Sequence, residues 1–287
     1  MRNAKVRNWV GRASYQATVK YFNQFGANPN ASLLPESPQH VRVTQNTAGD
    51  VTVTWNAPVV DAIGGQAATG YRVYSSSNGY GFDGGVAVAG GATLSYTVPA
   101  AQIGADAVYF RVAATNAGGE SIPSSVVGVR KAANPAQKLL IVNGFDRLDR
   151  SLNPRQTLPN ALVIDRVRPR AGNSFDYVVQ AGEAIEAFAP TQMGFDSVSL
   201  RSVELGHVSL LNYAGVIWLS GEQSTTDKTF TPTMQSHVSV FVAGGGDLFV
   251  SGSEIGWDLD QNGGGASFFN NTLKADYVGD DANTYAA

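Results

Sequence analysis

Hydrophobic residues near the start of the chain recur at spacings of three and four, from Val6 to Phe25. This spacing places them on one face of an amphipathic helix, and Gly26 is a natural end for that helix. The apolar face includes Trp9 and Tyr21, so we expect the helix to pack against another structure. Residues 27–37 are largely polar and contain prolines, which predicts a linker.

Residues 38–130 change to an alternation of apolar and polar positions. The clearest runs are Val51–Trp55, Tyr71–Val73 and Val108–Ala114, and Gly, Pro, Asn and Ser separate them. Five or more short strands at regular spacing, with no helical segment between them, are typical of a β-sandwich. This segment is therefore predicted to be a sandwich of about 90 residues.

Residues 138–287, after a short linker at 131–137, alternate strand-like and helix-like segments. Leu139–Val142 is apolar without a break, as in a strand buried on both faces. Such alternation predicts a parallel sheet with helices on both faces. The last stretch is polar and poor in strands, so whether this domain is complete stays open. The further predicted elements are a helix at 174–188, strands at 197–200, 214–219 and 247–250, and a helix at 231–242.

Composition agrees with two folded domains in an exported protein. The 287 residues are enough for two domains of about 150 residues each. Charged residues make up 15%, against about 25% in an average domain, and 32 glycines fit a chain rich in turns. A hydrophobic content of 43% argues against disorder. No apolar run is long enough to span a membrane, and residues 1–20 lack the apolar core of a signal peptide.

Charge and cysteine content narrow the chemistry. The first 35 residues carry five basic residues and no acidic one, although the whole chain has a net charge of −3. This basic segment fits either an anionic partner or the solvated face of the first helix. The absence of cysteine excludes disulfides, thiol nucleophiles and thiolate metal sites. His40, His207 and His237 lie in unlike contexts, which argues against a His-rich zinc centre, and His40 is expected to be an exposed loop residue.

Candidate site residues follow three predicted strands, because functional groups of open α/β sheets lie at the carboxyl ends of the strands. Ser251–Gly256 also fits the spacing Gly-x-nucleophile-x-Gly of a strained turn that lifts its central residue. A carboxylate in that position can act as nucleophile or general base, but no His follows it, so a degenerate site is the alternative. The predicted catalytic residues are Glu254 and Ser253, and the predicted binding residues are Asp146, Arg147 and Glu222.

The segment after this turn offers two further candidates. Asp258, Asp260 and Asn262 match the first half of a calcium-binding loop. The position of the final bidentate Glu holds Phe269, so a polar turn competes with calcium binding. Trp257, in the predicted loop, is a candidate aromatic surface for a sugar or peptide.

The predicted sandwich resembles a fibronectin type III domain. The residues that carry this resemblance are Pro38, Trp55, Gly70–Tyr74 and Phe110–Ser121. Val108 stands where the family has the Tyr of its tyrosine corner, and Tyr109 is the candidate to replace it.

The α/β segment resembles the class I glutamine amidotransferase-like fold, a flavodoxin-like parallel α/β architecture, with Glu254 where that family has its Cys nucleophile. In order, the basic helix, the sandwich and this domain resemble the C-terminal portion of bacterial N-acetylmuramoyl-L-alanine amidases, including relatives classed as xanthan lyases. Residues 1–26 are then similar to the last helix of a zinc amidase domain. The zinc ligands of that family lie upstream of this helix, so no residue in this chain inherits them.

The resemblance leaves two functions in competition. One is a non-catalytic accessory region of a secreted or envelope hydrolase, which positions a catalytic domain in cis on peptidoglycan or another glycan. The other is an α/β domain with hydrolase or amidotransferase activity of its own around Glu254. Neither requires a cofactor in this chain or a nucleic-acid partner.

Overall fold

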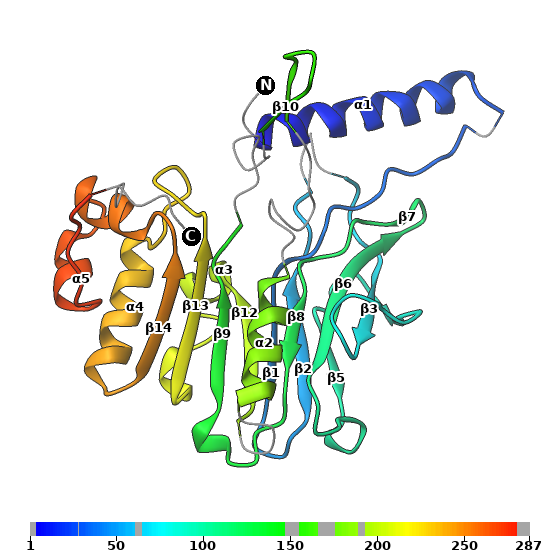
Figure 1. Cartoon of the computed structure of the whole chain (residues 1–287). Coiled ribbons are helices and arrows are strands. Elements are labelled where there is room, and N and C mark those ends of the chain that lie inside the picture. The colour runs from blue at the N-terminus through cyan, green and yellow to red at the C-terminus, as the bar shows by residue number, and fades with distance from the viewer. Residues whose placement is uncertain are drawn as a thin grey trace.

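The computed structural model describes residues 4–27, 29–60, 65–146, 155–165, 176–188 and 193–279. A long helix, α1 (Ala4–Phe25), precedes a β-sandwich, and a parallel α/β unit follows the sandwich (Figure 1). The predicted combination of a β domain with an α/β domain is confirmed.

Two sheets form the sandwich, and their apolar residues alternate toward the space between them. In β2, Val51, Val53 and Trp55 are buried, whereas the residues between them are only half-buried. The Trp55 ring lies 5.1 Å from that of Tyr71 in the opposite sheet. One sheet contains β1 (Gln39–Gln45), β2 (Val51–Asn56) and β5 (Ser95–Val98), and the other contains β3 (Gly70–Ser76), β4 (Val86–Ala89), β6 (Val108–Asn116), β7 (Gly119–Glu120) and β8 (Val127–Val129).

Four parallel strands form the centre of the α/β unit in the order β12-β9-β13-β14. Leu140 and Val142 face the core under one set of helices, whereas Ile141 faces the opposite core, which explains the unbroken apolar run of β9. The strands are β9 (Leu139–Asn143), β12 (Phe195–Ser199), β13 (Gly215–Gly221) and β14 (Asp247–Gly252).

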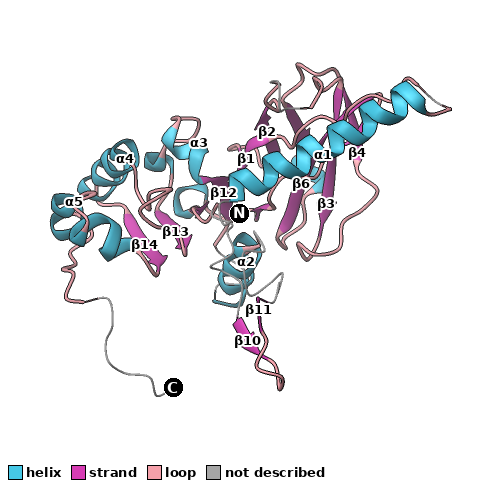
Figure 2. Ribbon diagram, turned by 90° about the horizontal axis from the view of Figure 1, so that it is seen from above, coloured by secondary structure: helices cyan, strands magenta, loops and turns pink. Residues whose placement is uncertain are grey.

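Helices cover both faces of this parallel sheet (Figure 2). The helix α2 (Tyr177–Phe188) lies on one face, and α3 (Leu200–Glu204), α4 (Pro232–Ala243) and α5 (Ala266–Asn271) lie on the other. Pro232 occupies the first turn of α4, and the Thr231 hydroxyl caps its N-terminus by accepting from Met234 N. The shorter elements are the hairpin of β10 (Arg155–Thr157) and β11 (Val163–Asp165), the single turns η1 (Ala100–Gln102), η2 (Pro135–Gln137) and η4 (Leu210–Asn212), and the π-turn η5 (Trp257–Gln261).

The two units share one sheet. The edge strand β12 of the α/β unit pairs with β1 of the sandwich in antiparallel register, Arg42 opposite Val198 and Val43 opposite Ser197. The result is a continuous seven-stranded sheet from β14 to β5. Backbone hydrogen bonds in both directions between Arg130 and Phe195, at 2.9 and 3.0 Å, add a second connection.

A buried polar cluster reinforces this junction. Lys138 Nζ lies 2.7 Å from the Asp196 carboxylate, and Lys138 also donates to Gln45 O at 2.8 Å. Asp196, which is fully buried, accepts further bonds from Gln45 N and the Tyr213 hydroxyl. Because these partners come from both units, the cluster fixes the sandwich relative to the α/β sheet.

Tyr109 belongs to the junction rather than to a tyrosine corner. Its ring is buried with Val178, Val179 and Phe195, and its hydroxyl donates to Val179 O at 3.4 Å. A tyrosine corner bonds the backbone a few residues upstream, so Tyr109 does not replace the family's corner. Burial, followed by the charge of Glu186, raises the pKa of Tyr109, and the hydroxyl therefore stays protonated.

The helix α1 lies across the sandwich end of the molecule (Figures 1 and 2). It contacts the following segment through an Arg12–Glu36 ion pair and through Tyr15 Oη, which accepts from Leu34 N at 3.0 Å. Trp9 and Phe25 nevertheless remain 51% and 66% exposed, so the expected packing of its whole apolar face is not found in the described chain. No described helix combines the length and apolar character that a membrane span requires.

Candidate functional site

The carboxyl ends of β9, β12, β13 and β14 converge on one edge of the parallel sheet. The chain runs from β9 outward to β12 and then returns past β9 to β13, which makes the β9–β13 boundary a topological switch point. Ligands of open α/β sheets bind at such points, outside the carboxyl ends of the strands. Asp146 follows β9 at this boundary, and Gln223 follows β13.

Glycine allows these two strand ends to approach closely. Gly144 N donates to Leu219 O at 2.7 Å. Gly221 has a φ of +52°, and a Cβ there would lie 2.6 Å from the Phe145 ring. Another residue at Gly221 would therefore meet both backbone strain and a steric clash.

Asp146 contacts both the Gln223 amide and the Arg201 guanidinium group at this edge of the sheet. Gln223, fully buried, donates from Nε2 to Asp146 Oδ1 at 2.6 Å. Arg201 Nε lies 3.7 Å from Asp146 Oδ2, and Arg201 Nη1 bonds Glu204 at 2.6 Å. The Asp146 side chain is 47% exposed, so a ligand can reach its carboxylate. The edge thus combines exposed acceptors with donors that neighbouring side chains hold in place.

Electrostatics keep Arg201 and Glu204 ionised. Burial lowers the pKa of Arg201, but the bond to Glu204 and the charge of Asp146 outweigh it and raise that pKa overall. Burial raises the pKa of Glu204, but its hydrogen bonds to Arg201 and Thr231 and the nearby positive charges together outweigh that effect, so the pKa of Glu204 is lowered overall. The pair therefore presents fixed charges at neutral pH.

Glu254 and Ser253 lie at the carboxyl end of β14, next to this cluster. Ser224 Oγ donates to Glu254 Oε2 at 3.3 Å, and Ser253 Oγ donates to Gly221 O at 3.4 Å. The Ser253 hydroxyl thus supports the turn. Glu222 lies near Tyr177 of α2, on the other face of the sheet. Burial raises the pKa of Tyr177, and the negative charge of Glu222 raises it further.

The predicted calcium ligands bond other parts of the protein. Asp258, which is fully buried, accepts from Thr229 N and Oγ1 at 2.8 Å and from Lys228 at 3.1 Å. The Asp260 carboxylate accepts from Tyr277 N, and the Asn262 amide donates to Trp257 O. In the described part of the chain, no group of three or more acidic or His side chains is placed to hold a metal ion.

Trp257 is half-buried and contacts Tyr277, with the ring centroids 6.2 Å apart. Both residues follow the end of β14 in the sequence. The predicted binding residue Arg147 lies outside the described residues.

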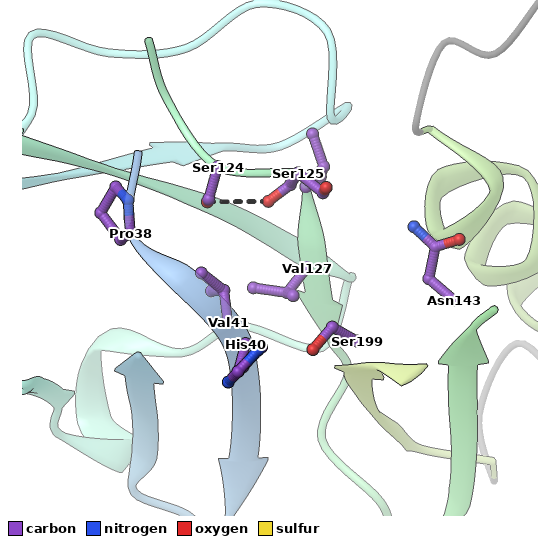
Figure 3. Close-up of a pocket in the computed structure, with 9 residues that line it drawn as sticks. Pro38, His40, Val41, Ser124, Ser125, Val127, Asn143 and Ser199 are labelled. Atoms are coloured by element: carbon purple, nitrogen blue, oxygen red, sulfur yellow. Dashed lines mark hydrogen bonds between the residues drawn. The ribbon is translucent and has the colours of Figure 1, made fainter. Parts of the chain in front are cut away.

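A second feature of this edge is a small cavity at the junction with the sandwich (Figure 3). Its volume is about 70 Å³, and Asn143 and Ser199 bring the ends of β9 and β12 to its wall. His40 lines it from β1, so the expectation of an exposed loop residue is wrong: His40 is half-buried within a strand, at an irregularity in the pairing of β1 with β2. The remaining lining residues are Pro38, Val41, Ser124, Ser125, Val126 and Val127.

Sequence reasoning missed Arg201, Gln223 and this cavity. Arg201 and Gln223 each follow the end of a strand by two residues, so the carboxyl-end rule that selected Asp146 could have found them. No sequence signal brings His40 and Asn143 to the wall of one cavity, because this arrangement depends on the pairing of β1 with β12.

A larger groove of about 570 Å³ lies on the opposite side of the sheet from α4. Its walls are mainly apolar and include Leu139, Ile217 and Phe249 from the strands and Ile185 and Phe188 from α2. None of the described residues that line it is charged at neutral pH.

Comparison with known proteins gives partial structural similarity only. No protein family and no curated protein match the sequence. Similar solved structures include titin domains A168–A170, at 30% identity over 32% of this chain and 30% of that chain, with a TM-score of 0.27. The FN5 domain of Drosophila Lar is 20% identical over 35% of this chain and 100% of that chain, with a TM-score of 0.26. The third fibronectin III domain of human KIAA0343 is 22% identical over 33% of this chain and 81% of that chain, with a TM-score of 0.27.

Each of these similarities covers about a third of this chain. The chain in turn spans less than a third of the titin structure and 32% of a chicken CNTN1 structure of domains FN1–FN3. The matches include fibronectin type III domains, the family that residues 38–130 resemble in sequence.

Proposed function

We propose that this chain is a glycan-binding accessory region of a secreted bacterial cell-wall hydrolase of the N-acetylmuramoyl-L-alanine amidase type. The observation that carries this proposal is the polar cluster at the switch point, where Asp146, Gln223, Arg201 and Glu204 gather at an accessible edge. Carboxylate, amide and guanidinium groups accept from and donate to hydroxyl groups, which is the chemistry that a sugar presents.

The shared sheet supports the positioning role. A ligand held at the switch point is coupled to the sandwich through β12 and β1, and the Lys138–Asp196 pair fixes that connection. The accessory region therefore sets a defined distance and direction between the bound glycan and any domain joined to α1. The flavodoxin-like strand order β12-β9-β13-β14 is also that expected for an amidotransferase-like domain.

Sedimentation with insoluble peptidoglycan tests the proposal. Arg201→Gln removes the charge that neighbours Asp146 and Glu204, and we expect the apparent affinity of the 287-residue protein for peptidoglycan to fall about tenfold. Arg72→Gln is the matched control, because Arg72 also pairs with a carboxylate, Glu120, but lies on the far sheet of the sandwich. Equal binding by wild type and Arg201→Gln, or an equal loss in both variants, would contradict the proposal.

The alternative function is hydrolysis by the α/β domain itself, and the Ser224–Glu254 contact is the observation that favours it. Glu254→Gln preserves the shape of this side chain and removes its carboxylate. We expect the variant to bind peptidoglycan as wild type does. Loss of a measurable hydrolytic activity in Glu254→Gln, with binding retained, would instead support the alternative.

A further inference from the structure

The helix α1 contacts its own chain through polar side chains and exposes its apolar face. Arg12 forms an ion pair with Glu36. The Asn23 amide exchanges two hydrogen bonds of 2.8 Å with the backbone of Ala31. An amphipathic helix on a globular protein normally places its apolar face on the core and its polar face in water, so α1 has the reverse orientation. The exposed residues of its apolar face are Trp9, Val10, Ala13, Ala17, Tyr21 and Phe25.

Aromatic side chains make one end of this face continuous. The Tyr21 ring lies 5.5 Å from that of Phe22 and 5.1 Å from that of Phe25, and all three residues are exposed. Contiguous exposed apolar surface of this kind marks an interaction site. The face therefore requires a partner.

The groove beside α2 lies where a second helix would cover the parallel sheet. Parallel sheets are covered on both faces, but α2 is the one described helix that packs on this face. Ile217 of β13 and Phe249 of β14 line the groove, and Phe249 is 60% exposed. Two strand spacings, about 10 Å, separate β14 from β9, and a helix is about 10 Å wide. The uncovered part of the sheet thus has room for one helix next to α2.

Small residues on α2 and α1 allow two helices to approach closely. Ala181 and Ala184 of α2 line the centre of the groove, and larger side chains line its ends. On α1, Ala13 and Ala17 lie between the aromatic residues of the exposed face. The side chains at a helix contact set the distance between the two axes, so both surfaces permit a short distance.

The charges of the helix and the groove are complementary. Asp247 is exposed and lies on the same face of β14 as Phe249, two residues later. At the other end of the groove, burial raises the pKa of Tyr177, and the nearby negative charges of Glu222 and Asp176 raise it further. Acidic groups therefore lie near both ends of an uncharged groove. The helix α1 has no acidic residue and has four basic ones, Lys5, Arg7, Arg12 and Lys20.

A second copy of the chain supplies a helix with these properties. Contacts with residues 31–36 hold α1 across the sandwich end of its own chain (Figure 1), and none of its described residues lines the groove. We propose that the apolar face of α1 in one copy packs into the groove beside α2 of another copy. Two copies offer two such contacts, one in each direction, and together these close a symmetric dimer. This inference goes beyond glycan binding and does not depend on it.

Sedimentation velocity of the 287-residue protein tests the inference. We expect the wild type to reach the mass of a dimer at concentrations up to about 0.1 mM. Trp9→Glu and Phe249→Glu each place a charge in the apolar contact and should raise the dissociation constant at least about tenfold. Val240→Glu is the matched control, because Val240 is 56% exposed on α4, at the opposite face of the sheet. It should associate as the wild type does.

A mixture of the two variants shows which surfaces meet. Trp9→Glu keeps an intact groove and Phe249→Glu keeps an intact α1, so the mixture should associate more strongly than either variant alone. Dimers of Phe249→Glu as stable as those of the wild type would mean that α1 packs against α1, which contradicts the inference. A wild type that stays monomeric at about 0.1 mM, or an equal loss in Val240→Glu, would also contradict it.

Disulfide formation tests the contact itself, because the chain has no cysteine. Ala17 and Ala184 are both exposed. When Ala17→Cys and Ala184→Cys proteins are mixed and oxidised, we expect a disulfide between the two chains. Val240→Cys is the control and should not cross-link to Ala17→Cys above background. A disulfide within a monomer that carries both Ala17→Cys and Ala184→Cys would show that α1 reaches its own groove and would overturn the inference.

Vesicles test the other occupant that fits a basic helix with an exposed aromatic face, an anionic membrane surface. Because the second copy covers this face, the associated protein should not sediment with phosphatidylglycerol vesicles. Vesicle binding by a monomeric wild type, abolished in Trp9→Glu, would assign α1 to lipid and overturn the inference. Peptidoglycan binding and self-association are separate measurements on separate variants, so the proposed function and this inference can each fail alone.

Discussion

His40 makes the stability of this protein sensitive to pH. Burial and the positive groups His207, Arg201 and Arg42 lower its pKa from 6.5, and Glu204 only partly opposes them. The unfolded chain therefore binds a proton at a pH where the folded protein does not. The free energy of unfolding should fall as pH drops below about 6.5 and should level off below the folded-state pKa.

Replacing His40 by Asn tests this effect, because Asn also tolerates a positive φ. Urea unfolding between about pH 5 and 7.5 should show a smaller slope of stability against pH for His40→Asn than for wild type. Some slope should remain, since burial also lowers the pKa of His207. Identical slopes in the two proteins would show that His40 is not protonated differently on folding.

At the level of single site residues, sequence locates positions but not partners. The carboxyl-end rule placed Asp146 and Glu254 beside strand ends, which is where they lie. It did not show that Gln223 bonds Asp146 or that Ser224 bonds Glu254, because such contacts depend on the geometry of neighbouring loops. It also gave no reason to look at His40, which reaches the edge from another unit.

Among the helices, α2 depends on a glycine for its close approach to the sandwich. A Cβ at Gly182 would lie 2.5 Å from the Tyr109 hydroxyl and 2.8 Å from the Phe195 ring. Overpacking of this kind costs about 1–3 kcal/mol, which exceeds the gain of up to about 1 kcal/mol in helix propensity. Gly182→Ala should therefore lower the free energy of unfolding in urea.

Two further variants test the cause of this loss. Gly11 in α1 has no atom within 4 Å of an added Cβ, so Gly11→Ala should stabilise the helix by up to about 1 kcal/mol. Tyr109→Phe removes the hydroxyl that the methyl group added by Gly182→Ala would meet, and the two substitutions combined should recover part of the stability. Destabilisation that is fully additive in the double variant would contradict the proposed contact.

Periodicity identified the long elements and left their pairing undetermined. The apolar run of Leu139–Val142 became β9, and the alternation at Val51–Trp55 became β2. The short strands β4, β7 and β8 have too few residues for a period to be recognised. The pairing of β1 with β12 could not be predicted, because alternation reports which face of a strand is buried and carries no information about its neighbour.

Across the whole molecule, the shared sheet should make the sandwich and the α/β unit unfold together. Breaking the pairing of β1 with β12 exposes Asp196, Phe195 and Tyr109, which are all buried at the junction. Either unit alone would therefore lose part of its core. A single cooperative transition, rather than two, is the expected form of the urea unfolding curve.

Lys138→Met tests this coupling directly. Burial already raises the pKa of Asp196, and the positive charge of Lys138 acts against that rise. Without Lys138, the carboxylate keeps only its bonds from Tyr213 and Gln45, and breaking a buried ion pair costs about 3–5 kcal/mol. Because Gln45 lies on β1 and Asp196 on β12, both units should be destabilised together.

Lys228→Met is the matched control for that loss. Lys228 also pairs with a fully buried carboxylate, Asp258, but its own side chain is 45% exposed, and Thr229 donates twice to the same carboxylate. We therefore expect Lys228→Met to lower the free energy of unfolding by only about 1 kcal/mol, the contribution of an exposed ion pair.

The tryptophans Trp55 and Trp218, buried in the sandwich and in the α/β core, can report the unfolding of each unit in variants with a single tryptophan. Coincident midpoints for the two reporters, lowered equally by Lys138→Met, are the expected result, whereas a shift of the Trp218 midpoint alone would mean that the junction does not couple the units.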